Sequence, residues 1–484
     1  MDPEVPIPSV LTPPLDATAP LDTTADPTPD RGWPPSARRR AVFVVVSAAL
    51  FMASIDQTIV ATALPTLQHD LHTQLDWGGW TITAYALGQL LTMPVAGKVS
   101  EQYGRKRVFL GAVALFTLAS LCCGLAGNIY ELVALRALQS IGGGAFMPAA
   151  TGIVTDLWGA GRDKALGLFT SIFPIGGIVG PVLGGVFVDY WSWRGIFLVN
   201  VPIGIALVIG GAVLIPSHLP HRTERFDVRG VALMGLTLLS GMLGITFLGD
   251  ARHEPSDPRF IGPIVLSVTA AALFVRHSRR APAPFIPLRL LTGPVFGVMN
   301  IINVVFGSAA AGFSALVPVY AQDRLHISPL SSSTMLVARS IGMVLASILA
   351  VSLLRRTGVR RPMVIGYIVI ATGLLLMPLS GPVLTSYAWI ATGATFTGIG
   401  IGISAPSSNN AALQLAPDNA AAIAGLRGMF RQIGGITAVS VSTAVAARSG
   451  DPATTLSWSF ATFAVIVLLV LPLIRHVPEH RGSW

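Results

Sequence analysis

The chain has 484 residues, of which 52% are hydrophobic and only 11% are charged, whereas charged residues make up about 25% of an ordinary soluble domain. This composition excludes a soluble enzyme or binding domain and indicates a chain whose main solvent is lipid. The formal net charge of +9 does not indicate nucleic-acid binding, because the basic residues lie in short loops between apolar segments, where they act as topology signals.

Residues 1–40 are rich in proline and acidic residues and lack the apolar core of a signal peptide, so we expect a disordered tail that is not a cleavable signal. Fourteen apolar segments follow, each long enough to cross a ~30 Å hydrocarbon core as a helix. We expect these spans near 41–65, 78–97, 108–127, 130–155, 165–189, 196–216, 229–249, 260–275, 293–318, 330–353, 363–380, 385–410, 421–447 and 457–475.

The distribution of basic residues predicts the orientation of the spans. With the N-terminal tail in the cytoplasm, most lysines and arginines fall in cytoplasmic loops, as the positive-inside rule requires. An even number of spans returns the C-terminal tail to the same side. We therefore expect a multi-pass protein of the inner (plasma) membrane with both termini in the cytoplasm.

An internal repeat predicts how the spans are grouped. A shift of 258 residues aligns 141–178 with 399–436 at eleven identical positions without a gap, which indicates parallel repeats related by an axis along the membrane normal. We expect a six-helix bundle at 41–216 and a second at 290–475. The linker 217–289 then supplies two extra transmembrane helices, and residues 476–484 form a cytoplasmic tail.

The first span, with SIDQTIVATALP at 54–65, contains Asp56, the only acid that we place deep within a span. A charge inside a membrane is costly and indicates function. Desolvation favours the protonated carboxyl and a nearby arginine such as Arg136 favours the ionised one, so Asp56 could load and release a proton. A fixed ion pair that joins two helices is the alternative interpretation.

Three further motifs predict moving contacts between helices. The loop 97–107 (GKVSEQYGRKR) combines turn-forming glycines with an acid and a basic cluster that can form an ion-pair latch, although a generic basic loop is the alternative. Span four begins LRALQSIGGG at 135–144, and span five carries GGIVGPVLGG at 176–185, where small residues every four positions form a smooth face and a proline bends the helix. Conformational gating is assigned to Gly97, Glu101, Gly104, Arg105, Arg107, Asp156, Gly176, Gly180, Pro181, Gly184 and Gly185.

Together these motifs resemble the major facilitator superfamily. The loop 97–107 is similar to its signature loop, with Glu101 where the family usually has Asp, and 176–185 is similar to its antiporter motif. The segments 54–65 and 193–204 (WRGIFLVNVPIG) resemble the fourteen-span drug:proton antiporters, of the type of the multidrug and quaternary-ammonium exporters. Ala61 stands where that family commonly has Asn. The resemblance covers nearly the whole chain after residue 40 and implies an all-α polytopic fold.

Arginines within the C-terminal spans predict contacts with cargo. Charged side chains at this depth either line a cavity or snorkel to an aqueous end, and both interpretations remain open. If they line the cavity, neutral, zwitterionic or anionic amphiphiles should be preferred over dications, because Asp56 is the single deep acid. The residues assigned to the substrate cavity are Tyr85, Gln139, Arg339, Arg427, Arg431 and Gln432.

The function that we predict is proton-coupled export of apolar or amphipathic small molecules by alternating access. An exporter of lipid or of an endogenous metabolite, or a proton-coupled importer, is the alternative on the same fold. No ATP-driven pump is expected, because Gly97-Lys98 is followed by Val99 rather than by Ser or Thr. We expect no catalytic residue, cofactor, metal site or nucleic-acid partner, and a monomer whose partners are its substrate, protons and the bilayer.

Overall fold

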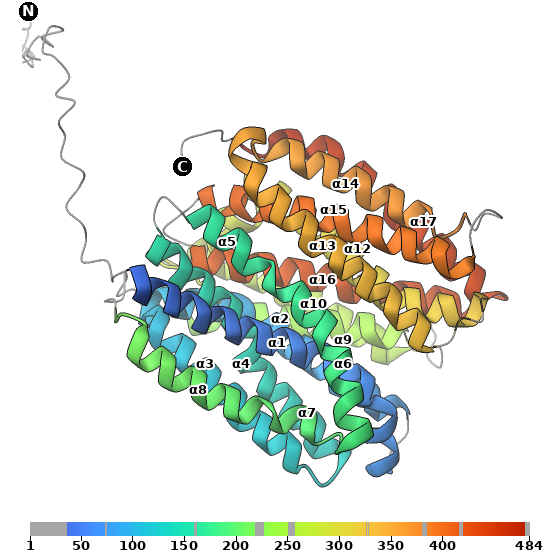
Figure 1. Cartoon of the computed structure of the whole chain (residues 1–484). Coiled ribbons are helices and arrows are strands. Elements are labelled where there is room, and N and C mark those ends of the chain that lie inside the picture. Colours follow the sequence, from blue (N-terminus) through green and yellow to red (C-terminus); the bar gives the residue numbers. More distant parts are fainter. Residues whose placement is uncertain are drawn as a thin grey trace, which may run out of the picture.

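Lipid offers no hydrogen-bond partner to the peptide backbone, so apolar segments of this length are expected to fold as helices. The computed structural model is a bundle of long helices (Figure 1). It describes residues 36–72, 75–158, 162–217, 227–249, 257–325, 327, 329–379, 385–415 and 420–479. The predicted disordered tail lies outside these residues up to position 35.

The helices of the N-terminal half are α1 (Ser36–Asp70), α2 (Leu75–Tyr103), α3 (Arg105–Leu125), α4 (Ile129–Trp158), α5 (Arg162–Thr170), α6 (Ile172–Tyr190), α7 (Gly195–Leu198) and α8 (Asn200–Leu214). Two helices then follow in the linker, α9 (Val228–Gly249) and α10 (Pro258–Arg280). The remaining elements are α11 (Leu288–Thr292), α12 (Pro294–Leu325), α13 (Pro329–Thr357), α14 (Arg360–Leu375), α15 (Ser386–Leu415), α16 (Ala420–Ala447), α17 (Pro452–Leu469) and the 3₁₀ helix η3 (Leu471–His476).

Ten helical segments within the described residues are long and apolar enough to cross a membrane. The prediction of a helical multi-pass membrane protein is thereby confirmed. The helices α2, α4, α14 and α16 are not among the ten, and α14 has 16 residues, fewer than the roughly 20 that a span needs. The predicted number of fourteen spans therefore stays a prediction.

Some boundaries differ from those expected from the sequence. Residues 36–40, which we predicted as the end of the tail, form the first turns of α1. There the Arg38 guanidinium donates hydrogen bonds to the carbonyls of Val213 and Leu214, which satisfies the end of α8. Predicted span five is divided at Ser171 into α5 and α6, and predicted span six at Val199 into α7 and α8.

Contacts between the two halves follow the internal repeat. The backbone of α16 at Gly425 lies against Met93 on α2, and the backbone of α5 at Gly167 lies against Val351 on α13. At the shift of 258 residues that aligns the repeat, Gly425 corresponds to Gly167, and Met93 corresponds to Val351. The two contacts are thus related by the pseudo-two-fold axis of the duplication.

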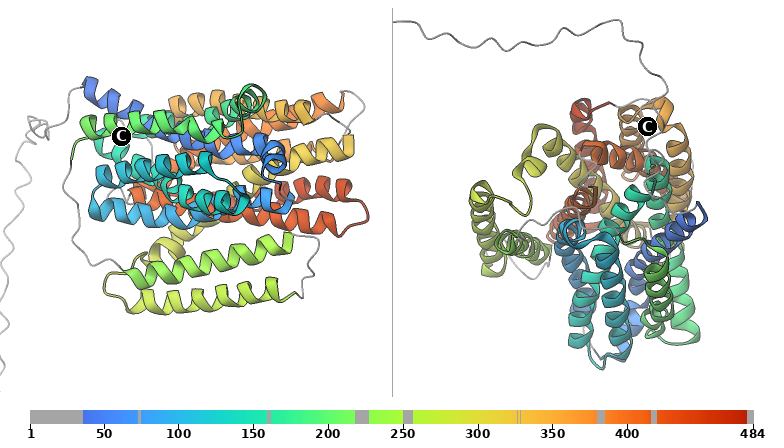
Figure 2. Two further views of the ribbon diagram at one scale, coloured as in Figure 1. Left: turned by 90° about the horizontal axis from the view of Figure 1, so that it is seen from below. Right: turned by 90° about the vertical axis from the view of Figure 1, so that its left-hand side faces the viewer.

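The helices α9 and α10 form a hairpin at the periphery of the molecule (Figure 2). They pack mainly on each other, and α9 also contacts α16 and α2. The hairpin therefore lies beside the place where α2 of one half meets α16 of the other.

Candidate functional site

A buried ion pair lies inside the N-terminal half. The Nη1 atom of Arg136 on α4 donates to Oδ2 of Asp56 on α1 at 2.6 Å. The relative exposure of these two residues is 1% and 0%, so water screens neither charge. Removing a pair of this kind from water is costly unless further hydrogen bonds satisfy the remaining polar atoms.

Neutral polar side chains supply those hydrogen bonds. Oδ1 of Asp56 accepts from Nε2 of Gln139 at 3.0 Å and from Nδ2 of Asn200 at 3.2 Å. Gln139 in turn accepts from Nη1 of Arg136 at 2.6 Å, and the amide groups of Gln139 and Asn200 both donate to Oγ of Ser120. One hydrogen-bond network around this carboxylate thus joins four helices, α1, α3, α4 and α8.

The aromatic ring of Tyr85 closes the site on another side. The guanidinium carbon of Arg136 lies 4.1 Å from the centre of this ring, a cation–π contact, while Nε of Arg136 donates to the carbonyl of Thr81 at 3.4 Å. The hydroxyl of Tyr85 is buried and has no hydrogen-bond partner among the described residues. It lies next to the backbone of Gly143, where a Cβ would come within 2.2 Å of it.

The glycines of α6 form the face that packs on α1 next to Asp56. A Cβ at Gly176 would lie 2.5 Å from Ser54, one at Gly180 would lie 2.0 Å from Oγ1 of Thr58, and one at Gly184 would lie 3.0 Å from the carbonyl of Ile59. A Cβ at Gly185 would meet open space. Three of the four predicted glycines therefore allow close approach of the two helices, and the side chain of Pro181 lies outside the described residues.

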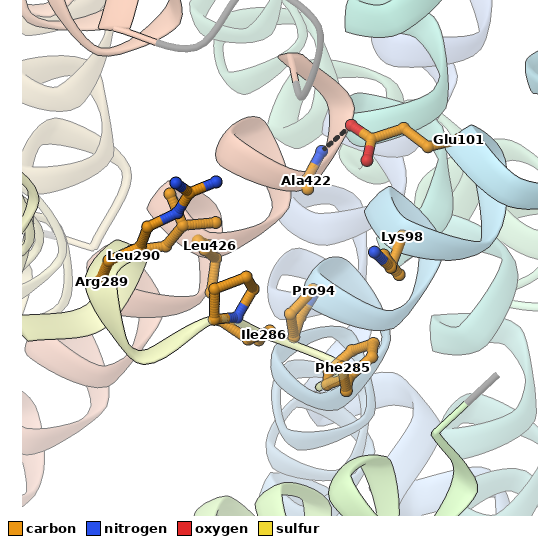
Figure 3. Close-up of a pocket in the computed structure, with 10 residues that line it drawn as sticks. Pro94, Lys98, Glu101, Phe285, Ile286, Arg289, Leu290, Ala422 and Leu426 are labelled. Carbon is orange, nitrogen blue, oxygen red and sulfur yellow. Dashed lines mark hydrogen bonds between the residues drawn. The ribbon is translucent and has the colours of Figure 1, made fainter. Parts of the chain in front are cut away.

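The segment 97–107, which we predicted as a loop, is helical except at Gly104, which lies between the end of α2 and the start of α3, and it contacts the opposite half. Oε1 of Glu101 accepts a hydrogen bond from the backbone N–H of Ala422, in the first turn of α16, at 3.0 Å (Figure 3). A carboxylate is favourable there, because the first N–H groups of a helix have no partner within it. A Cβ at Gly97 would lie 2.6 Å from the carbonyl oxygen of Ala421, so only glycine fits, and Gly104 has a φ of 97°.

Two other charged residues of this segment, Arg105 and Arg107, lie within the N-terminal half. Nη1 of Arg105 forms an ion pair with Asp156 and donates to the carbonyl of Gly152, both on α4. Arg107 is exposed. The structure thus brings Glu101 to α16 and Arg105 to Asp156, while Arg107 lies apart from both contacts.

The C-terminal arginines occupy three different environments. Arg339 on α13 donates to Oγ of Ser314 and, at 3.0 Å, to the carbonyl of Ala310, so it is held against α12. Nη2 of Arg427 donates to Ser408 at 3.1 Å, and its Nη1 is buried without a partner among the described residues.

Arg431 lies where the two halves meet. Its guanidinium carbon is 6.0 Å from the ring centre of Phe173 on α6, and these two residues are themselves related by the shift of 258 positions. The pseudo-two-fold axis therefore passes between them. Gln432, which follows in α16, is partly buried.

Sequence reasoning missed several members of the buried network. Asn200 belongs to a motif that we quoted for its resemblance, yet neither it nor Ser120 was assigned a role. A neutral polar residue in an apolar run was the available signal for both. The pair formed by Gln57 and Gln89, whose amide groups join α1 to α2 at 2.8 Å, carried the same signal.

Comparison with known proteins now assigns the family. The model of the Major Facilitator Superfamily matches residues 46–439 and, in a second match, 299–483. The chain belongs to this superfamily. The resemblance stated from the motifs is confirmed at this level, and the chain is a multi-pass membrane transporter rather than an enzyme.

Three named proteins align with most of this chain. It is 30% identical over 411 residues to the Multidrug transporter protein MdtP of Bacillus subtilis (83% of this chain, 74% of the relative). It is 32% identical over 404 residues to the Multidrug resistance protein B homolog of Mycobacterium tuberculosis strain H37Rv (82% and 73%). The Tetracenomycin C resistance and export protein of Streptomyces glaucescens is 27% identical over 428 residues (87% and 77%).

Solved structures agree on the fold. The human organic anion transporter MFSD10 (TETRAN) superposes with a TM-score of 0.68 at 15% sequence identity, covering 91% of this chain and 100% of its own. The proton:xylose symporter XylE gives 0.65 at 14%, covering 92% and 97%. At these identities the likeness extends to the fold alone.

Proposed function

We propose that this transporter is a proton-coupled antiporter that exports apolar or amphipathic small molecules, including drugs and antibiotics. The observation that carries the proposal is the Asp56–Arg136 pair, in which a buried carboxylate is held by donors from two other helices. When helices move, such a carboxylate loses or gains donors, and its affinity for a proton changes with them. Binding of a proton can thereby be coupled to the conformation of the transporter.

The names of the relatives support the export of drugs. Two are multidrug proteins, and a third is a resistance and export protein for tetracenomycin C. Cargo differs among proteins of one fold, so an exporter of lipid or of an endogenous metabolite, or a proton-coupled importer, remains the alternative. All of these would be monomeric carriers in the plasma membrane with both termini in the cytoplasm.

The proposed architecture has two six-helix bundles, 41–216 and 290–475, with α9 and α10 as two extra transmembrane helices. In this orientation the contact between Glu101 and Ala422 lies on the cytoplasmic side. The arrangement described here is therefore closed toward the cytoplasm, and its alternate would separate α2 from α16 at this end.

The test compares uphill with downhill transport in proteoliposomes. Asp56→Asn should abolish accumulation driven by a proton gradient but retain exchange of labelled for unlabelled substrate, because exchange needs no net proton movement. Glu131→Gln, which alters an exposed carboxylate at the start of α4, should leave both activities close to the parent. Uphill transport by Asp56→Asn at the rate of the parent would refute the proposal.

A further inference from the structure

A groove lies at the end of the contact between α2 and α16, under the chain segment that connects α10 to α12 (Figure 3). Its apolar lining includes Pro94 of α2, Leu426 of α16, and Ile286 and Leu290 of the connecting segment. The groove thus exists where three parts of the molecule meet: the N-terminal half, the C-terminal half and the linker.

The connecting segment is fixed in place by Asp227, just before α9. Oδ2 of Asp227 accepts from the backbone N–H of Phe285 at 3.0 Å, and its Oδ1 lies 2.8 Å from Nε2 of His277 on α10. Oδ1 also accepts from the N–H of Gly230 at 2.9 Å. Phe285 is 2% exposed. This wall of the groove is therefore preformed.

Two cations flank the apolar surface. Figure 3 places Lys98 of α2 and Arg289 of α11 on opposite sides of Pro94 and Ile286. The third charged residue of the lining is Glu101, which accepts the N–H of Ala422, and the formal charges of the three residues sum to one positive charge.

More basic residues lie close by along the chain. The exposed residues Arg276, Arg279 and Arg280 belong to the last turns of α10, directly before the connecting segment. They add to the positive potential at this end of the molecule.

We propose that the groove binds an anionic phospholipid, with the start of the acyl chains along Pro94, Ile286 and Leu426 and the headgroup reaching the cations that flank this surface, Lys98 and Arg289. Basic pockets between transmembrane helices on the cytoplasmic side are suited to anionic headgroups, and both cations can donate charge-assisted hydrogen bonds to a phosphate. The groove lies near the ends of α2 and α10, the depth at which headgroups are found.

The lipid would favour one conformation of the transporter. The lining residues come from both α2 and α16, so the groove is complete only while these helices touch. A ligand that binds one state better than another shifts the population toward it. Bound lipid therefore stabilises the state in which Glu101 contacts α16. This inference depends on the membrane orientation and is independent of proton coupling and cargo.

Binding can be measured on the purified full chain in neutral detergent by native mass spectrometry, with dioleoyl phosphatidylglycerol, dioleoyl phosphatidylcholine and glycerol 3-phosphate as probes. Phosphatidylglycerol should bind more tightly than phosphatidylcholine. Lys98→Gln and Arg289→Gln should each weaken phosphatidylglycerol binding about fivefold, the effect of about 1 kcal/mol per basic residue near a membrane surface. Glycerol 3-phosphate, which has no acyl chains, should not displace the lipid.

Arg356→Gln is the matched control, because Arg356 is an exposed cation at the end of α13 and does not line the groove. This variant should bind phosphatidylglycerol like the parent. Arg289 is itself exposed, so its variant should keep the thermal midpoint of the parent and report on binding alone. Equal affinity for the two lipids would overturn the proposal. An equal loss of phosphatidylglycerol affinity in Arg356→Gln and Arg289→Gln would overturn it as well. So would displacement of bound phosphatidylglycerol by glycerol 3-phosphate.

Discussion

At the scale of residues, the central feature of the molecule is one carboxylate, that of Asp56, which is fully buried. Asp56 receives donors from Arg136, Gln139 and Asn200, which lie on two other helices. A charge so placed is tolerated because each of its oxygens is hydrogen-bonded. Loss of a single donor should therefore lower the stability of the folded protein.

Removing Arg136 alone should be more harmful than removing the whole ion pair. Arg136→Ala leaves the Asp56 carboxylate buried without a cation, which costs about 3–5 kcal/mol. Adding Asp56→Asn removes the uncompensated charge, so the double variant should have a higher thermal midpoint in detergent than Arg136→Ala. Arg107→Ala, an exposed cation, should stay close to the parent. A double variant less stable than Arg136→Ala would contradict this account.

The sequence could predict Asp56 and Arg136 because a charge within an apolar run is rare and costly, which makes each one conspicuous. It could not predict Asn200 as a partner of Asp56, or Ser120 as the acceptor shared by Gln139 and Asn200, because neutral polar residues occur in many spans. Only the packing of α8 against α1 and α3 brings these residues together. Arg339 was expected near cargo, whereas its hydrogen bonds to α12 depend on a helix contact that the sequence does not specify.

At the scale of elements, the contacts of Gly425 and Gly167 differ in how easily the neighbouring atoms could move to make room for a Cβ. A Cβ at Gly425 would lie 2.2 Å from the backbone carbonyl of Met93, whereas a Cβ at Gly167 would lie 2.3 Å from a methyl of the Val351 side chain. A side chain can change its rotamer and a helix backbone cannot. Gly425→Ala should therefore separate α2 from α16 more than Gly167→Ala separates α5 from α13.

The separation can be measured by cysteine labelling. Cys122 and Cys123 are replaced by Ser, and each variant carries one new cysteine at its own contact: at Met429, a buried residue of α16, for Gly425→Ala, and at Ser171, which corresponds to Met429 at the shift of 258 residues, for Gly167→Ala. A membrane-impermeant maleimide should react several-fold faster in Gly425→Ala than in the parent, with a smaller increase in Gly167→Ala. The reverse order of the two variants would be inconsistent with this explanation.

The hydrogen bonds by which Asp227 holds the segment between α10 and α12 should contribute stability that depends on pH. Burial acts to raise the pKa of Asp227, but hydrogen bonds from the Gly230 amide, the His277 ring and the Phe285 amide outweigh burial and hold the pKa below its ordinary value of 3.8. Stability from this carboxylate is thus fully present above that ordinary value. It is lost as the pH falls through the lower pKa of the folded state.

Asp227→Asn removes the charge at every pH. At pH 7 we expect amide exchange in residues 285–290 to become about tenfold faster, since hydrogen bonds to a charged group contribute about 1.5–3 kcal/mol and Asn retains part of the acceptor capacity. Hydrogen–deuterium exchange with mass spectrometry measures this change, with residues 360–375 of α14 as an internal reference. Unchanged exchange in 285–290 would show that Asp227 does not hold the linker.

At the scale of the whole molecule, duplication and apolar length allowed much of the fold to be predicted. Apolar runs must be helical in lipid, and the shift of 258 residues reappears in the contacts of Gly167 and Gly425. The helix breaks at Ser171 and Val199 each lie three residues before a proline, Pro174 and Pro202, which cannot donate to the carbonyl four residues back. The breaks were not predicted, because proline is also tolerated within transmembrane helices. The place of the α9–α10 hairpin beside α16 depends on packing that the sequence pattern does not encode.

The charge distribution of the whole molecule predicts its cargo preference. Asp56 is the only fully buried acid among the described residues and is already paired, whereas Arg431 lies on the axis between the halves. A buried dication would lack a counter-charge, so neutral, zwitterionic or anionic amphiphiles should be favoured. In competition assays, Arg427→Gln and Arg431→Gln should weaken inhibition by anionic amphiphiles about tenfold.

Arg339→Gln should have a smaller effect in the same assay, because Arg339 is engaged by α12. The competing compounds are dicationic antiseptics, monocationic dyes and anionic amphiphiles. Preferential export of dications that none of these substitutions changes would contradict the predicted preference.

The central claim, that outward movement of cargo is coupled to inward movement of protons, is tested most directly by following protons. The purified protein is reconstituted in vesicles with an internal pH dye and no initial pH gradient, and a substrate gradient is then imposed. The account predicts a substrate-dependent pH change in the direction of exchange in the parent and in Glu131→Gln, and none in Asp56→Asn. Substrate movement in the parent without any pH change would contradict it.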